Sequence, residues 1–395
     1  MNVALIGMGC GPETLSEAAK DALDRAELVI GSARLLSLAP AGNECEKKEA
    51  VRAAEIFSLL SASEAREACV LFSGDTGFFS GARNLLPLPE GFDVHVLPGI
   101  SSMQLFAARL ERPWEEWLFC SAHGRACDAL SMVCRGKPVF FLTGGENSPA
   151  SLCRELTDAG LGFLRVFAGE DLGTKTEQVR EGTAAEFAQE TFSPLSVLLV
   201  LPAPRSARRA PGLPDEYFER LEGVPMTKQE VRAVISAKLG ITPEDVCWDI
   251  GAGTGSVGIE LALQAKSVWA VERSAQALML AEKNRARLGA WNLHLTEGNA
   301  PEALSALPAP DAVFVGGSGG RLSEILRFAH EANPHARICV SAIAPETLAA
   351  ALEALTALGM KTEVTLLSAA RSREAGGLHL MTGLNPVWLI TGENE

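Results

Sequence analysis

The stretch Asp249-Ile250-Gly251-Ala252-Gly253-Thr254-Gly255 decides the fold of the C-terminal half of the chain. It ends an apolar run at 246–250, which predicts a buried strand, and it precedes a helical pattern at 256–265. Its glycines let the backbone turn from strand into helix and pass close to a ligand. The next apolar run, 268–272, ends in Glu272. This order of elements is typical of nucleotide-binding α/β domains: a strand, a glycine loop, a helix and a second strand that ends in an acid.

Two classes of enzyme use this layout. Residues 253–258 match the pattern G-x-G-x-x-G, so an NAD-dependent α/β oxidoreductase is one alternative. The other is a G-x-G-x-G loop preceded by an acid, which holds S-adenosylmethionine in methyltransferases. Asp249 favours the methyltransferase, because a carboxylate suits the ammonium group of that ligand and is poorly placed beside a pyrophosphate. The cofactor-binding residues that this interpretation predicts are Asp249, Gly251, Ala252, Gly253, Thr254, Gly255, Glu272 for the ribose, and Asn299 and Ala300 for the adenine.

The rest of the chain alternates strand and helix signals on both sides of one break in composition. Residues 202–214 hold four prolines and three arginines, which predicts a semi-extended, exposed linker. After it, residues 227–230 form a predicted capping box that opens a helix. We therefore predict an α/β protein with domains at 1–201 and 223–395, joined by a linker at 202–222. The other predicted strands are 3–6, 28–30, 69–72, 94–97, 117–121, 139–142, 165–168, 196–201, 293–296, 312–315 and 338–341, with a closing antiparallel pair, 364–367 and 387–390, joined by a long loop.

Composition narrows the classes of function. The 395 residues carry 49 acidic and 35 basic side chains, a formal charge of −14, which argues against a general nucleic-acid binder. No apolar run approaches the roughly 18 residues that span a bilayer, and the N-terminus lacks the basic start of a signal peptide. We expect a cytoplasmic protein with no membrane partner. Nine scattered cysteines predict reduced thiols, and no metal site is expected at Cys120, Cys127 and Cys134 with His123.

Residues 223–391 resemble the decarboxylating methyltransferase domain of cobalamin biosynthesis. The resemblance rests on these motifs: Pro225-Met226-Thr227-Lys228, Glu230-Val231-Arg232, the glycine loop, residues 298–304 (GNAPEAL), residues 316–320 (GGSGG) and Asn385-Pro386-Val387. It adds Thr227 to the predicted cofactor site, and Asn299 stands where that family commonly carries Asp. The amides of Gly316, Gly317 and Ser318, at a helix start, are expected to bind substrate carboxylates, with Arg371 as a side-chain clamp.

Residues 1–201 resemble the tetrapyrrole methylases, and among them the precorrin-6Y branch. The carriers of this resemblance are residues 7–12 (GMGCGP), 73–79 (SGDTGFF), 97–102 (LPGISS), 121–125 (SAHGR), 147–149 (NSP) and 170–173 (EDLG). The resemblance implies a domain of two α/β lobes, with S-adenosylmethionine bound by Gly74, Asp75, Gly99, Ser101 and Ser102. It places Gly9 and Gly11 on the tetrapyrrole side and makes His123 and Arg125 candidate substrate contacts.

Together the two halves resemble the fused, decarboxylating precorrin-6Y (6B) C5,15-methyltransferases. The resemblance implies two S-adenosylmethionine sites, carbon-5 methylation in the N-terminal domain, and carbon-15 methylation with loss of the ring-C acetate carboxyl in the C-terminal one. It also implies a homo-oligomer, and it favours a cobalt-containing macrocycle over a metal-free one. A third alternative is a methyltransferase-like domain that only binds or channels tetrapyrroles. No general acid or base is assigned.

Overall fold

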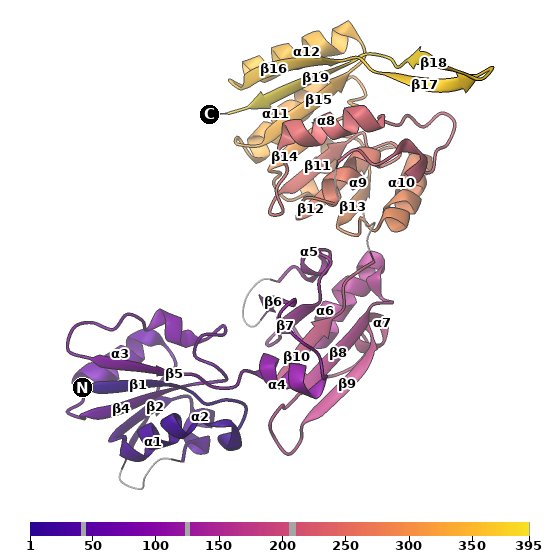
Figure 1. Ribbon diagram of the computed structural model, residues 1–395. Coiled ribbons are helices and arrows are strands. Elements are labelled where there is room, and N and C mark those ends of the chain that lie inside the picture. Colours follow the sequence, from indigo (N-terminus) through magenta and orange to yellow (C-terminus); the bar gives the residue numbers. More distant parts are fainter. Residues whose placement is uncertain (41–44, 123–126, 205–210, 395) are drawn as a thin grey trace. The chain divides into compact units, whose positions relative to one another are not determined.

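The computed structural model describes residues 1–40, 45–122, 127–204 and 211–394. The chain forms two compact units (Figure 1). Unit 1 comprises Met1–Val133 and Lys137–Pro202, and unit 2 comprises Ala203–Glu395 with Cys134–Gly136. Among the described residues, no helix is long and apolar enough to cross a bilayer.

Unit 1 contains two sheets. The first is fully parallel, with the order β3-β2-β4-β1-β5. Its strands are β1 (Asn2–Gly7), β2 (Leu28–Gly31), β3 (Glu46–Glu49), β4 (Glu67–Phe72) and β5 (Asp93–Leu97), with helices α1 (Glu17–Arg25), α2 (Ala33–Leu38) and α3 (Ala53–Ala62). Separate apolar clusters cover its two faces, one against α3 and one against α1 and α2.

The second sheet of unit 1 is mixed, with the order β6-β7-β10-β8-β9. Only β6 and β7 pair in parallel. Its strands are β6 (Leu118–Ser121), β7 (Val139–Leu142), β8 (Arg165–Glu170), β9 (Gln178–Thr183) and β10 (Ser196–Val200), with helices α4 (Ser102–Arg109), α5 (Ala129–Val133), α6 (Pro149–Leu156) and α7 (Ala184–Phe187).

Unit 2 is built on a seven-stranded sheet with the order β13-β12-β11-β14-β15-β19-β16. The first five strands in this order are parallel, and β19 runs antiparallel to β15 and β16. The strands are β11 (Val246–Ile250), β12 (Ser267–Glu272), β13 (Leu293–Glu297), β14 (Ala312–Val315), β15 (Arg337–Ala342), β16 (Lys361–Leu367) and β19 (Val387–Glu393). The helices are α8 (Gln229–Leu239), α9 (Ser256–Ala262), α10 (Ala275–Leu288), α11 (Leu322–Ala332) and α12 (Pro345–Ala357).

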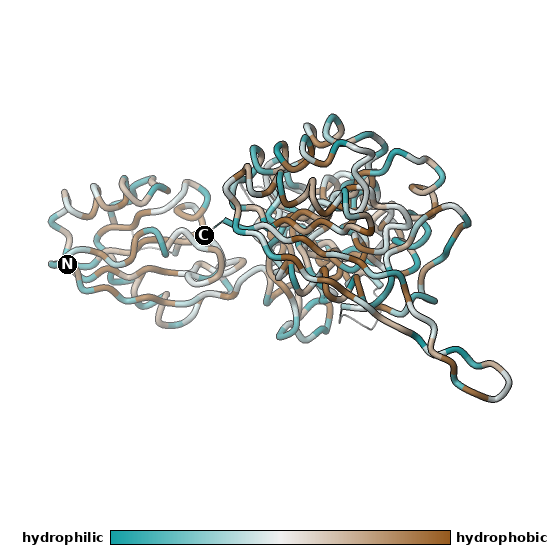
Figure 2. Tube along the Cα trace, turned by 90° about the horizontal axis from the view of Figure 1, so that it is seen from above, coloured by the Kyte–Doolittle hydropathy of each residue, from teal (hydrophilic) through white to brown (hydrophobic). Residues whose placement is uncertain are grey.

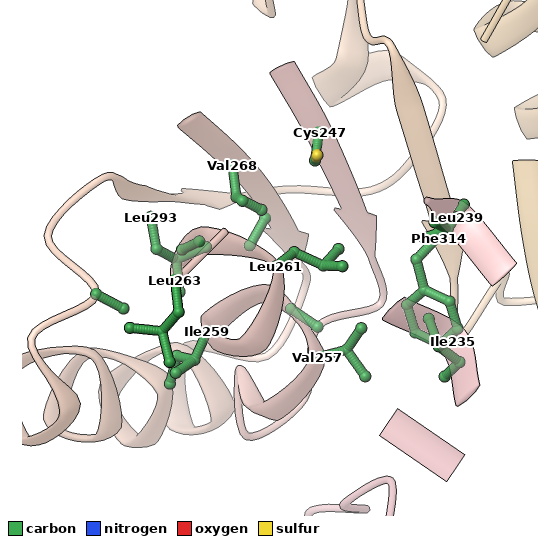
Figure 3. Close-up of a cluster of buried hydrophobic side chains, with 14 of the residues drawn as sticks. Ile235, Leu239, Cys247, Val257, Ile259, Leu261, Leu263, Val268, Leu293 and Phe314 are labelled. Carbon is green, nitrogen blue, oxygen red and sulfur yellow. The ribbon is translucent and has the colours of Figure 1, made fainter. Parts of the chain in front are cut away.

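Side chains alternate between the two faces of this sheet. Cys247 and Phe314 belong to an apolar cluster that includes residues of α8 and α9. Trp248 and Val313 belong to a second cluster, on the other face, that includes residues of α11 and α12. Figure 3 shows Val257, Ile259, Leu261 and Leu263 among the side chains of the first cluster, and Figure 2 shows hydrophobic residues concentrated along the strands. The predicted α/β fold is therefore confirmed, and it places the glycine loop at the carboxyl end of β11.

Three segments form strands where the sequence analysis expects none. The long loop predicted between 367 and 387 is a hairpin of β17 (Ala370–Ala375) and β18 (Leu378–Gly383), which extends away from the sheet (Figure 1). Strands β3 and β9, which the sequence analysis missed, are sheet edges; β3 is the run Glu-Lys-Lys-Glu, whose four residues are all exposed. Charged edge strands lack the apolar signal on which strand prediction relies.

The segment predicted as an exposed linker is partly packed onto unit 2. Leu213 is fully buried in the apolar cluster that includes Val231, Ile235 and Leu239 of α8. The amides of Gly212 and Leu213 donate hydrogen bonds of 2.7 and 2.8 Å to the carboxylate of Glu260 in α9. The residues after 210 therefore contribute to the core of the C-terminal unit.

Candidate functional site

A cavity of about 930 Å³ opens at the carboxyl ends of the parallel strands of unit 2. Loops after β11, β12, β13 and β14 form its wall together with the segment before α8. Of the residues predicted to bind the cofactor, Thr227, Asp249, Gly251, Ala252, Gly253, Glu272, Asn299 and Ala300 line this cavity, as do Gly316, Gly317 and Ser318. The motifs are up to 91 positions apart in sequence (227 to 318), and the sheet topology brings them to one edge.

The two glycine-rich loops pack directly against each other. Gly251 has a φ of 75°, and a Cβ at this position would lie 2.6 Å from the backbone nitrogen and oxygen of Gly317. The amides of Gly316 and Gly317 donate to the carbonyl of Ile250 at 2.9 and 3.2 Å. Glycine is thus required at Gly251 both by the backbone conformation and by the close approach of the second loop.

These contacts bear on the prediction that the amides of Gly316, Gly317 and Ser318 bind substrate carboxylates. The amides of Gly316 and Gly317 are used within the protein, so they do not face a ligand freely. Further along the same loop, the amides of Ser318, Gly319 and Gly320 have no hydrogen-bond partner among the described residues. Binding of a carboxylate by this loop stays a prediction, and it now rests on Ser318 and Gly319, which line the cavity.

Glu272 ends β12 with its carboxylate oriented by two backbone amides. Oε2 accepts a hydrogen bond from Gly253 at 3.0 Å, and Oε1 accepts one from Ser274 at 3.0 Å. Each carboxylate oxygen can accept a second hydrogen bond. Glu272 therefore presents two acceptors to the cavity in a fixed orientation, as recognition of a pair of ribose hydroxyls requires.

Asp249 is fully buried at the end of β11. Its Oδ2 accepts a 2.7 Å hydrogen bond from the amide of Gly258, and Oδ1 has no partner among the described residues. Burial raises the pKa of Asp249 to about 7; the bond from Gly258 opposes this shift and the charge of Glu272 adds to it. A buried carboxylate oxygen without a partner is costly unless a ligand supplies a donor. The wall of the cavity therefore contains a half-satisfied acceptor suited to a cation.

Two predicted residues of the glycine loop do not line the cavity. Thr254 is fully buried, and Gly255 is the N-cap of α9 with a φ of 73°. Asn284 of α10 donates to the carbonyl of Thr254 at 3.0 Å and accepts from the amide of Glu219 at 2.7 Å. Thr254 and Gly255 shape the loop, and a direct contact with a cofactor stays a prediction for them.

The segment that lines the cavity before α8 is held by a buried ion network, which the sequence analysis missed. Arg232 is fully buried; it binds Asp215 at 2.9 Å and Glu260 at 3.0 Å, and it donates to the carbonyl of Thr227. The predicted capping box at 227–230 is wrong: α8 has no side-chain cap from Thr227, and Asp215 accepts from the amide of Gln229 at 3.0 Å instead.

Arg371, predicted as a substrate clamp, belongs to the same network. Its guanidinium binds Oδ2 of Asp215 at 2.8 Å and both oxygens of Glu230, at 2.8 and 2.6 Å. Burial raises the pKa of Asp215, but the hydrogen bonds from Arg232 and Arg371 outweigh burial and place it below its usual range. Arg371 thus joins the base of the hairpin to α8, and a contact with substrate stays a prediction.

In unit 1, the predicted glycines gather at the carboxyl edge of the first sheet. Gly9 and Gly74 exchange backbone hydrogen bonds of 3.0 and 3.2 Å. A Cβ at Gly99 would lie 2.4 Å from the carbonyl oxygens of Gly7 and Gly74, so the ends of β1, β4 and β5 are in close contact. Asp75 spans these loops, accepting from Gly77 at 2.8 Å and from Gly99 at 3.2 Å.

The other predicted residues of unit 1 have local roles. Ser101 caps α4 in a capping box with Gln104, and Ser102 is the first residue of that helix. The amide of Gly11 donates to Oγ1 of Thr14 at 3.2 Å. Ligand contacts for all these residues stay predictions. His123 and Arg125 lie outside the described residues, and among the described residues no cluster of three potential metal ligands occurs.

Comparisons with known proteins cover both units. The model of the tetrapyrrole (corrin/porphyrin) methylases matches residues 2–188, and that of the precorrin methyltransferase domain matches residues 217–392. A precorrin-6Y C(5,15)-methyltransferase (decarboxylating) from Sinorhizobium is 31% identical over 399 residues, covering 98% of this chain and 95% of the relative.

Two further matches cover about half of the chain. A probable cobalt-precorrin-6B C(15)-methyltransferase (decarboxylating) from Pyrobaculum calidifontis is 45% identical over 185 residues, which are 46% of this chain and 95% of that protein. The crystal structure of a precorrin-6Y C5,15-methyltransferase from Geobacter metallireducens shares 35% identity, with a TM-score of 0.46, and covers 48% of this chain and 100% of that one.

The oxidoreductase alternative finds no support among these relatives, whose names are those of methyltransferases. The match that spans 98% of the chain accounts for both units at once, including the order of the tetrapyrrole methylase and the precorrin methyltransferase domain. The chain belongs to the family of decarboxylating precorrin-6Y C5,15-methyltransferases, which are S-adenosylmethionine-dependent enzymes of cobalamin biosynthesis.

Proposed function

We propose that this protein methylates precorrin-6B, or its cobalt complex, at carbons 5 and 15 and removes the carboxyl group of the ring-C acetate. The observation that carries the proposal is the match to a decarboxylating C(5,15)-methyltransferase over 98% of the chain. The cavity of unit 2 supports it, since Glu272 and Asp249 both lie in its wall.

The residues of this cavity fit S-adenosylmethionine. Oδ1 of Asp249 is buried without a partner among the described residues, and an ammonium group would satisfy it. The two oxygens of Glu272, already oriented by Gly253 and Ser274, match the two hydroxyls of a ribose. The backbones of Gly251 and Gly317 approach each other so closely that neither a side chain nor a Cβ fits at Gly251. In this assignment Asn299 and Ala300 lie at the adenine.

When bound, S-adenosylmethionine supplies an electrophilic methyl group on a positively charged sulfur. The chain has to orient the substrate, because an enamine-like meso carbon of a reduced tetrapyrrole is itself the nucleophile and needs alignment more than a strong base. Glu272 and Asp249 would hold the ribose and the ammonium group of the donor, and so orient its methyl group. Loss of carbon dioxide leaves an electron pair that the conjugated imine of the macrocycle accepts, so no protein nucleophile is required.

We assign carbon-15 methylation and decarboxylation to unit 2 and carbon-5 methylation to unit 1. Two findings support this division: the model of the precorrin methyltransferase domain matches residues 217–392, in unit 2, and the C(15)-methyltransferase relative matches 185 residues, about the length of one unit. In unit 1, Gly74, Asp75 and Gly99 converge at the edge of a parallel sheet and form a second candidate site for S-adenosylmethionine. Two cofactor sites in one chain would let one protein carry out both methylations.

The test is a product analysis with purified full-length protein, S-adenosylmethionine, and precorrin-6B or cobalt-precorrin-6B. The proposal expects a product that has gained two methyl groups and lost one carbon dioxide. Parallel reactions with the metal-free and the cobalt substrate identify the form that the enzyme uses. A product that carries new methyl groups with every carboxyl retained would contradict the decarboxylation.

A further inference from the structure

Two arginines lie in the wall of the cavity of unit 2, and their surroundings differ. Arg321 binds both oxygens of Glu302, at 2.6 and 2.7 Å, and one oxygen of Glu324 at 2.6 Å. Arg273 is exposed and has no carboxylate within ion-pair distance among the described residues. The charge of Arg321 is therefore neutralised within the protein, whereas the charge of Arg273 is available to a ligand.

The position of Arg273 directs this charge across the mouth of the cavity. Arg273 follows the last residue of β12, and a Cβ built on Gly319 would lie 3.7 Å from its Nη1. Gly319 belongs to the loop after β14, and β12 and β14 flank β11 on opposite sides in the sheet. The guanidinium thus reaches over the end of β11, above the loop that begins at Gly251.

The wall of the cavity is otherwise acidic, so the positive charge of Arg273 matters for binding an anionic substrate. Asp249 and Glu272 also line the cavity, Arg321 is paired with two carboxylates, and the whole chain carries a formal charge of −14. A substrate with several carboxylates would be repelled by such a wall unless a cation faced it. Arginine suits this role, because its planar guanidinium binds a carboxylate through two parallel hydrogen bonds.

We propose that Arg273 binds a carboxylate of the substrate, one of the acetate or propionate side chains of the tetrapyrrole, and so places the macrocycle over the methyl donor. This inference rests on the proposed function of unit 2. A carboxylate is also present in S-adenosylmethionine. However, Asp249, the proposed acceptor for the ammonium beside that carboxylate, is fully buried, whereas Arg273 is exposed. The substrate is therefore the source that the geometry favours.

The test compares the full-length protein with Arg273→Gln, Arg273→Lys and a control, Arg287→Gln. Arg287 is exposed at the end of α10, has no ion pair among the described residues, and lies outside the cavity wall. Its replacement changes the net charge equally. For each protein, calorimetry gives the Kd for S-adenosylmethionine, and carbon dioxide release gives KM and kcat for the tetrapyrrole at two ionic strengths.

For Arg273→Gln we expect KM for the tetrapyrrole to rise about tenfold or more, with the Kd for S-adenosylmethionine unchanged. Arg273→Lys keeps the charge but lacks the paired donors, so its KM for the tetrapyrrole should lie between those of the wild type and Arg273→Gln. Added salt should raise KM less in Arg273→Gln than in the wild type, because the screened contact is gone. Arg287→Gln should match the wild type in every value.

Three outcomes would overturn the inference. An unchanged KM for the tetrapyrrole in Arg273→Gln contradicts a substrate contact. A weaker Kd for S-adenosylmethionine with unchanged KM for the tetrapyrrole shows instead that Arg273 contacts the cofactor, through its carboxylate or by stacking on the adenine. Wild-type protein that binds S-adenosylmethionine but releases no carbon dioxide contradicts the proposed function, and this inference with it. The wild-type arm therefore separates the two failures.

Discussion

The amide of Gly258 donates a 2.7 Å hydrogen bond to Oδ2 of Asp249, while Oδ1 of the same carboxylate is buried with no partner among the described residues. The hydrogen bond fixes the side chain at the start of α9, where a Cβ on Gly258 would clash with it. In the proposed function this unpaired oxygen accepts a hydrogen bond from the ammonium group of S-adenosylmethionine. Asp249 therefore has two roles: one oxygen stabilises the start of α9, and the other is the proposed contact with the cofactor.

This arrangement predicts a pH-dependent cofactor affinity. Burial raises the pKa of Asp249 to about 7, so the neutral carboxyl predominates below that pH. Pairing with an ammonium group requires the ionised form, so the affinity of unit 2 for S-adenosylmethionine should rise by about tenfold per pH unit up to about pH 7 and then level off. Calorimetric titrations across this range measure the effect.

Asp249→Asn is the control for this pH dependence. Its affinity should be weaker and should not change across the same range. The raised pKa also means that ionisation of Asp249 destabilises the ligand-free fold as the pH rises from the ordinary range of a carboxyl to about 7. Asp249→Asn removes this loss. An affinity that falls as the pH rises towards 7 would contradict the proposed role of the carboxylate.

The buried network around Arg232 predicts a large effect on stability. Removing one partner of a buried ion pair leaves an uncompensated charge and costs about 3–5 kcal/mol. We therefore expect Arg232→Met, which removes the buried cation that pairs with both Asp215 and Glu260, to lower the thermal midpoint of unit 2 markedly. Lys238→Met breaks the ion pair with Glu363 at the surface and should change stability little. Scanning calorimetry compares the two variants, and equal midpoints would be the contrary result.

The same network could not be predicted from local sequence patterns. Asp215 and Arg371 are 156 positions apart, and Asp215 caps α8 from 14 residues before Gln229. The sequence indicates a capping box at Thr227 because that pattern is local, and tertiary contact overrides it. Burial of Leu213 was missed for a similar reason: the prolines around it indicate an exposed linker, and only its packing on α9 shows otherwise.

The parallel strands and the glycine site were predictable for a physical reason. Strands β11 and β14 match their predicted bounds, because buried parallel strands are continuous apolar runs. Polar motifs that follow such strands must meet at the carboxyl edge of the sheet, which brings Glu272 and Asn299 to the cavity of Asp249. Arg273 was overlooked, although a basic residue directly after Glu272 at this edge was the available signal.

The packing of residues 211–218 predicts where unit 2 can be separated. A fragment that starts at Ala203 keeps Leu213 and both amides that bind Glu260. A fragment that starts at Pro214 loses them. The burial of one leucine side chain alone stabilises the fold by about 1.5–3 kcal/mol. We expect the longer fragment to unfold at a clearly higher temperature. Similar midpoints for the two fragments would show that the segment contributes little to the core.

Two cofactor sites predict a measurable stoichiometry. Calorimetric titration of the full-length chain should give two molecules of S-adenosylmethionine per chain, one for the site around Asp75 and one for the site around Glu272. Glu272→Ala should leave one site, because the loops around Asp75 are built from other residues. A wild-type stoichiometry of one, with all binding lost in Glu272→Ala, would contradict the assignment of two sites.

Glu272 also discriminates between loss of a ligand contact and loss of loop structure. Hydrogen bonds to a charged group are worth about 1.5–3 kcal/mol each, so Glu272→Ala should weaken cofactor binding in unit 2 by one to several powers of ten. Glu272→Gln keeps one carbonyl acceptor, so it should lose less cofactor affinity than Glu272→Ala. If both variants lost the same affinity, the graded loss expected from two ribose contacts would be absent.

The measurement that tests the division of labour most directly is product mass analysis of Glu272→Ala with saturating tetrapyrrole. The proposed assignment predicts a product that has gained one methyl group, at carbon 5, and has kept all its carboxyl groups. Wild-type protein run in parallel should add two methyl groups and release carbon dioxide. Carbon-15 methylation with carbon dioxide release at the wild-type rate in Glu272→Ala would contradict the assignment of unit 2.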